Sequence, residues 1–346
     1  LPIDIALQVT IPNEWEKIAK TNIGYTAGIE TTAVDSQWLM KANEIVDSII
    51  VVSNHSANVF RESSYSGTDQ NGQPVSLTLQ KPISAVNYPV KTFDELPDIP
   101  LDITTKTNFL TVAQFGPRKN LPNTIKWFVE EFRDNPDVGL VVKANIAKNC
   151  LMDREKLYND LKESYGPNSS LGEFKCKIYL LHGSMTDEEM HSLYQHSKIH
   201  ALVSFTHGEG FGLPLFEAAY SGLPVIAPGW SGQMDFLCDE KGKEHFYNVS
   251  FDMARIPPEA VWPGVLMEQS MWCYPREVSA KEQMRDCYND IVNNTGLANK
   301  SCEYAKELTE RFSEEKMYDA FVSRCLPIAE MEKLQQDVDS LLDDLQ

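Results

Sequence analysis

Residues 204–222 read SFTHGEGFGLPLFEAAYSG and join an apolar, strand-like run to a helix-like run through a glycine-rich turn. Glycines at positions 208, 210 and 212 allow the backbone to turn sharply and leave amide N–H groups exposed. Pro214 is typical of a first helical turn, and the positive end of the helix dipole points at the same place. The segment therefore predicts an anion site, most naturally for phosphate.

The turn differs from the G-x-G-x-x-G fingerprint of dinucleotide-binding proteins. Its third glycine comes one residue early, and its strand lies late in the alternating region rather than first. A nicotinamide cofactor is therefore not expected.

Two carboxylates flank the turn, Glu209 and Glu217, eight positions apart. A carboxylate beside an anion is unfavourable unless it accepts hydrogen bonds from other groups, and neutral hydroxyls are the obvious donors. A phosphate with a polyol on either side describes a nucleotide sugar, with the ribose diol at one carboxylate and the donor sugar at the other. The alternative to a nucleotide-sugar site is that Glu209 is a solvated acid in a loop and Glu217 is an acid on a helix surface.

Strand and helix patterns alternate on both sides of this turn. This alternation predicts a parallel, doubly wound sheet whose ligand site lies at the carboxyl ends of the strands. We expect strands at 109–115, 138–144, 176–182, 199–205 and 224–227, and helices at 122–133, 153–164, 186–196 and 213–221.

The first hundred residues show a shorter alternation, followed by a polar, proline-rich stretch at 62–107 that is expected to be a linker. After residue 235 the pattern is mostly helical. We expect strands at 3–9, 22–27 and 48–53, and helices at 36–46, from Ser56, at 281–292 and at 302–312. The predicted division is an N-terminal Rossmann-like unit with linker at 1–100, a second domain at 101–312, and a helical segment at 313–346. With three clear strands, the N-terminal unit is expected either to lack an upstream part or to be abbreviated.

Composition narrows the class of protein. The chain has 346 residues and a formal net charge of −19, which argues against nucleic acid as a partner. Seven cysteines without a C-x-x-C pair indicate reduced thiols and a cytoplasmic location, and no apolar run is long enough to span a membrane. Apolar residues at 331, 334, 338, 341 and 345 predict a helix that packs on its own chain or, through 328–346, on a second copy.

The motif Glu209-x7-Glu217, with Gly-Phe-Gly-Leu-Pro between the acids, resembles the E-x7-E motif of retaining nucleotide-sugar glycosyltransferases of family four. The similarity runs over 108–312. Residues 115–120, FGPRKN, resemble the donor-phosphate loop of that family, and Val141-Val142-Lys143, Leu181-His182-Gly183 and Ala227-Pro228-Gly229 stand where later strands end. The resemblance implies a GT-B-like α/β fold with two Rossmann-like domains.

The resemblance also implies roles for individual residues. Glu209 would support positive charge at the anomeric carbon of the donor, and Lys119 and Arg118 would neutralise the leaving phosphate. Glu217 would hold the ribose hydroxyls. The remaining donor-binding residues implied are Gly210, Phe211, Gly212, Leu213, Lys143, His182 and Gly183.

Two positions depart from the family pattern. Gln114 stands where the family often has Arg, so Arg118 is expected to supply the second cation. The acceptor-domain His of the family has no counterpart in Ala27-Gly28-Ile29-Glu30-Thr31. Acceptor-side candidates are Gly28, Glu30 and His207, although His207 and His182 also fit a structural role.

The function expected is transfer of a sugar from a nucleotide sugar, of UDP or GDP type, to a glycan, a lipid-linked acceptor or another hydroxyl, with retention. No cofactor or metal is expected, because His191 and His196 lie five apart on one helix and share no face. Other GT-B enzymes remain alternatives: an epimerase, a phosphorylase or a transferase on modified DNA bases. A nucleotide-binding interaction module is the non-enzymatic alternative.

Overall fold

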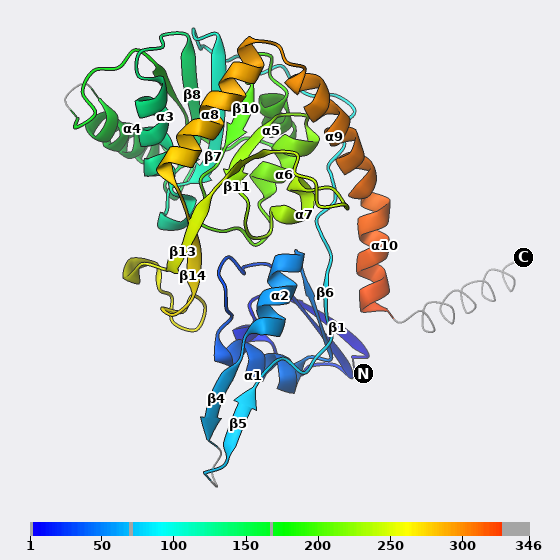
Figure 1. The fold of residues 1–346 in the computed structure, drawn as a ribbon. Coiled ribbons are helices and arrows are strands. Elements are labelled where there is room, and N and C mark those ends of the chain that lie inside the picture. The colour runs from blue at the N-terminus through cyan, green and yellow to red at the C-terminus, as the bar shows by residue number, and fades with distance from the viewer. Residues whose placement is uncertain (1–2, 69–71, 167–168, 327–346) are drawn as a thin grey trace, which may run out of the picture.

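The computed structural model describes residues 3–68, 72–166 and 169–326. Two α/β units stack on one another, and a long helical segment runs from the second unit back to the first (Figure 1). The predicted tail helix at 328–346, with the dimer contact expected there, lies outside the described residues.

The N-terminal unit is built on a four-stranded, fully parallel sheet in the order β1-β2-β3-β6. Its strands are β1 (Ile5–Val9), β2 (Thr21–Thr26), β3 (Ser48–Val51) and β6 (Ile83–Ala85), and its helices are α1 (Ser36–Ile45) and α2 (Asn54–Glu62). A hairpin of β4 (Tyr65–Thr68) and β5 (Pro74–Leu77) extends from it. The expected linker at 62–107 is therefore wrong in part, because a three-residue strand between polar stretches carries too little periodicity to be recognised.

The second unit contains a six-stranded parallel sheet in the order β12-β11-β10-β7-β8-β9. Its strands are β7 (Thr107–Gln114), β8 (Val138–Asn145), β9 (Lys177–Leu181), β10 (Ala201–Val203), β11 (Val225–Pro228) and β12 (Tyr247–Val249). The predicted α/β class with parallel sheets is confirmed, and the expected strands at 109–227 fall within a few residues of the observed ones.

Helices cover both faces of this sheet, each through its own apolar cluster. One face packs against α3 (Leu121–Phe132), α4 (Leu151–Tyr165) and α8 (Glu277–Val292). The other packs against α5 (Asp187–Tyr194), α6 (Leu213–Tyr220), α7 (Met234–Leu237) and α9 (Leu297–Arg311). The carboxyl ends of the strands are thereby left free for loops.

The expectation of mostly helix after residue 235 is wrong for 247–275. Besides β12, this stretch forms an antiparallel hairpin of β13 (Phe251–Arg255) and β14 (Met271–Pro275). Its loop reaches the N-terminal unit, where Asn13 Nδ2 and Trp38 Nε1 both donate to the carbonyl of Gly264, at 2.9 and 2.8 Å. The hairpin is thus a second connection between the units.

The helix α10 (Glu314–Cys325) completes the return to the N-terminal unit. Its Phe321 ring packs edge-on against Tyr25, with 5.9 Å between ring centroids, beside the buried Ile23 and Ile50. The domain boundaries at 100 and 312 stay a prediction. Over the described residues, no helix is long and apolar enough to cross a membrane.

Candidate active site

The glycine-rich turn lies between β10 and α6, at the carboxyl edge of the larger sheet. Gly212 has a φ of 99°, and its carbonyl accepts the amides of Leu215 and Phe216 to start the helix. The amides of residues 210–213 find no acceptor among the described residues. Leu213 is 41% exposed, whereas the three residues before it are buried. Consecutive free amides at a helix N-terminus favour an anion.

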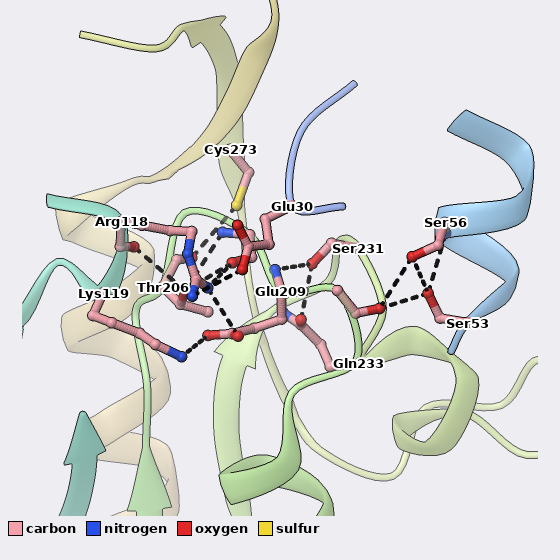
Figure 2. A network of polar contacts seen from close by, with 12 residues as sticks. Glu30, Ser53, Ser56, Arg118, Lys119, Thr206, Glu209, Ser231, Gln233 and Cys273 are labelled. Carbon is pink, nitrogen blue, oxygen red and sulfur yellow. Dashed lines mark hydrogen bonds and ion pairs between the residues drawn. The ribbon is translucent and has the colours of Figure 1, made fainter. Parts of the chain in front are cut away.

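Two of the glycines also allow the units to approach each other. A Cβ on Gly208 would meet the carbonyl of Glu30, and one on Gly210 would meet the carbonyl of Ala27. The Ser53 hydroxyl at the start of α2 donates to the Gly210 carbonyl at 2.6 Å (Figure 2). The glycines therefore serve an inter-unit contact that the sequence motif alone does not indicate.

Glu209 lies at the centre of a buried charge cluster, shown in Figure 2. One of its oxygens, Oε1, accepts from Lys119 Nζ at 2.5 Å. The other, Oε2, pairs with an Arg118 guanidinium nitrogen at 2.9 Å. The other terminal guanidinium nitrogen of Arg118 pairs with Glu30 at 3.0 Å. The Glu209 side chain is only 7% exposed. Three of the predicted site residues and one acceptor-side candidate thus lie together.

The topology explains why distant residues meet here. Strands β7 and β10 are neighbours, so the loops that follow them leave the same edge of the sheet side by side. Arg118 and Lys119 lie on a short 3-10 turn after β7, which ends at Asn120 in the left-handed region. The Asn120 side chain donates to the Phe205 carbonyl at 3.0 Å and fastens this turn to the loop after β10.

The charges settle the protonation of Glu209. Burial alone would raise the pKa of its carboxyl group, but Arg118 and Lys119 outweigh burial and lower that pKa. Burial raises the pKa of Glu30, against the opposing pull of Arg118. Glu209 is therefore an ionised carboxylate across the physiological range, and its negative charge is fixed in place.

Glu217 lies in a different set of contacts. The Tyr194 hydroxyl donates to it at 3.2 Å, and Lys91 Nζ from the inter-unit connection is 3.7 Å away. Its side chain is 14% exposed, and burial raises its pKa. The two acids of the motif therefore have separate partners, and Lys91 lies beside the carboxylate expected to hold ribose.

Lys143, His182 and Gly183 are near one another at the ends of β8 and β9. Lys143 Nζ donates to the carbonyl of Gly183, and His182 Nε2 lies 2.8 Å from an Asp153 oxygen. Asp153 also accepts the amides of residues 146–148, which lowers its pKa. These contacts hold the loops that follow β8 and β9 together.

The remaining acceptor-side candidates, Gly28 and His207, lie outside the charge cluster around Glu209. Gly28 is exposed beyond the end of β2. The His207 Nδ1 is 2.7 Å from the Cys273 carbonyl, and its ring stacks on Trp272 with 5.7 Å between centroids. His207 therefore fits the structural role, because it anchors β14 to the site.

Glu209 has a second support, from the loop after β11, that was not predicted from the sequence. The Ser231 hydroxyl, after β11, accepts the backbone N–H of Glu209 at 2.9 Å. The same hydroxyl donates to Gln233 Oε1 at 2.9 Å, and Gln233 Nε2 donates to the Pro228 carbonyl. The signal available was the run Trp230-Ser231-Gly232-Gln233 directly after a strand. Within the described residues, no group of three or more His, Cys, Asp or Glu could hold a metal ion.

Comparison with known proteins agrees with this architecture. Residues 93–253 match the family model described as "Glycosyl transferases group 1". The serotype-specific mannosyltransferase WbdA of Escherichia coli is 33% identical over 119 residues, which are 34% of this chain and 13% of WbdA. The chain thus corresponds to a small part of that relative. Residues 93–253 are therefore similar to glycosyltransferase group 1 domains.

Solved structures extend the similarity to both units. A complex of S. aureus TarM with UDP has a TM-score of 0.50 at 15% identity, covering 89% of this chain and 51% of that one. An E. coli structure described as trehalose-6-phosphate bound with UDP-2-fluoro glucose has a TM-score of 0.58 at 9% identity, covering 95% and 74%. At these identities the comparison shows the fold alone, which is GT-B-like with two Rossmann-like units.

Proposed function

We propose that this chain transfers a hexose from a nucleotide sugar to an acceptor hydroxyl with retention at the anomeric carbon. The observation that carries the proposal is the conjunction of free amides at 210–213 with Lys119 and the ionised Glu209. A diphosphate at the amides would place its leaving oxygen near Lys119 and its sugar near Glu209. The family match at 93–253 and the WbdA similarity support sugar transfer.

Glu209 acts in this proposal by its charge rather than as a nucleophile. Two cations hold its oxygens, and its pKa is lowered despite burial, so its lone pairs are poorly available for bond formation. A fixed negative charge stabilises the positive charge that develops as the donor bond breaks. The E-x7-E resemblance is the support for retention.

Donor binding would use Glu217 and the loops at the ends of β8 and β9. Glu217 would accept the ribose hydroxyls, with Lys91 yielding part of its contact, while the loop held by Lys143, His182 and Gly183 would border the nucleotide. Gly28 and Glu30 would face the acceptor. WbdA is a mannosyltransferase, so mannose linked to GDP or UDP is the first donor to test.

The test is a panel of nucleotide sugars, with release of nucleoside diphosphate followed with and without glycan or lipid-linked acceptors. We expect acceptor-dependent release from one donor, and the anomeric configuration of the product is read by NMR. An epimerised nucleotide sugar without release, or dependence on inorganic phosphate, would identify the epimerase or phosphorylase alternative. Nucleotide binding without any turnover would identify a binding module and refute the proposal.

A further inference from the structure

Arg118 bridges two carboxylates that come from different units of the fold. One terminal nitrogen of its guanidinium pairs with Glu209 of the second unit at 2.9 Å, and the other pairs with Glu30 of the first unit at 3.0 Å. The guanidinium also donates to the Gly208 carbonyl at 2.6 Å. Figure 2 shows Arg118 between the two acids. The cluster is complete only when both units contribute.

The position of Glu30 is set by the end of β2. Ile29, buried in the first unit, precedes it, and the carbonyl of Glu30 packs directly on Gly208. The Glu30 side chain is 22% exposed and the Arg118 side chain 24%. Solvent therefore screens the charges of Glu30 and Arg118 only in part, and both charges act on the neighbouring Glu209.

With Lys119 included, the cluster is neutral, since two cations face two carboxylates. Under the proposed function, the positive charge of Lys119 pairs with the leaving diphosphate as the bond between sugar and phosphate breaks. The three groups that remain, Glu209, Arg118 and Glu30, then carry a net charge of −1. Without Glu30, Arg118 would neutralise Glu209 fully, and the developing sugar cation would meet no net negative charge.

We propose that Glu30 is a positioning residue for transfer: it holds Arg118 between the units and thereby leaves the charge of Glu209 available to the donor sugar. This inference rests on the proposed function of the site and adds that the N-terminal unit controls the charge of the donor site. Arg118 is then a bridge within the site rather than the phosphate-neutralising cation expected from the sequence.

The test compares Glu30→Gln and Glu30→Asp with wild type. Thr32→Val is the matched control, because Thr32 lies on the same loop and makes another inter-unit contact, accepting the Met271 amide at 3.0 Å. We expect Glu30→Gln to lower kcat about 100-fold. It should tighten nucleoside diphosphate binding about fivefold, because one negative charge leaves the site. Glu30→Asp should recover part of kcat, and Thr32→Val should stay near wild type.

Calorimetric titration of GDP and UDP separates this inference from the proposed function, since it needs no turnover. Tighter diphosphate binding by folded Glu30→Gln supports the charge argument even if wild type transfers no sugar, which would refute only the proposed function. Wild-type kcat in Glu30→Gln, or weaker diphosphate binding, overturns the inference. So does a loss of kcat that Thr32→Val reproduces, because it would reflect inter-unit packing alone.

Discussion

Replacing Glu209 with Gln tests the centre of the site, because it removes the charge and nearly preserves the volume. Removing one partner of a buried ion pair costs about 3–5 kcal/mol. Here Arg118 keeps Glu30, and Lys119 is 19% exposed and turns to water. We therefore expect the free energy of unfolding to fall by only about 2 kcal/mol. The variant should stay folded.

Its activity should fall much further than its stability. Loss of a group that stabilises charge in the transition state typically costs about 100- to 1,000-fold in kcat. Affinity for nucleoside diphosphate should be kept or rise, since the site loses a negative charge. Turnover is measured as diphosphate release, and Glu130→Gln, which breaks a half-buried pair with Lys281 away from the site, is the control. Wild-type turnover in folded Glu209→Gln would refute the role of this carboxylate.

Three further substitutions test the cation at the anion site, the protonation of His55 and the contact between the hairpin loop and the N-terminal unit. Lys119→Met should weaken nucleoside diphosphate binding about tenfold at low salt, by titration calorimetry, because the anion loses its fixed cation. The His55 side chain is half-buried, and its loss of solvation lowers its pKa to about 4, so the folded state binds fewer protons than the unfolded state between that value and 6.5. Its contribution to stability is present above pH 6.5 and is lost as pH falls, and relative to His55→Gln the wild type should lose about 3 kcal/mol by urea unfolding toward pH 4. Trp38→Phe should destabilise the protein about 1 kcal/mol more than Trp15→Phe, since only Trp38 donates from its indole N–H to the hairpin loop.

Each of these has a result that contradicts it. Lys126→Ala removes a helix-surface cation paired with Glu130, and an equal loss of diphosphate affinity there would deny Lys119 a specific role. Parallel stability curves for wild type and His55→Gln would show that His55 is solvated. Both tryptophans are fully buried in one cluster, so equal losses in the two Phe variants would mean that the bond to the hairpin contributes nothing.

The larger sheet could be predicted from sequence because its signals are local. Apolar runs such as 138–144, bounded by turns, mark strands buried on both faces, and the capping box Thr186 to Glu189 marks the start of α5. Strand β6 and the hairpin β13–β14 escaped prediction because tertiary pairing, rather than periodicity, holds them in place.

The local motifs of the site could also be predicted from the sequence, but the contacts between the two units could not. The glycine spacing and the two acids marked the turn, and FGPRKN marked the opposite loop. The sequence could not show that Arg118 faces Glu30, or that Gly208 and Gly210 seat the other unit, because those contacts join residues about 90 to 180 positions apart. The sequence assigned Glu209 and Glu217 different partners, but it could not show that Tyr194 and Lys91 are the contacts of Glu217.

A structure of the protein with a bound nucleoside diphosphate is the most decisive test of the proposed anion site. We expect the diphosphate oxygens within hydrogen-bonding distance of the amides of residues 211–213 and of Lys119 Nζ, with the ribose at Glu217. A diphosphate bound elsewhere, or these amides still without an acceptor at saturating nucleotide, would contradict it.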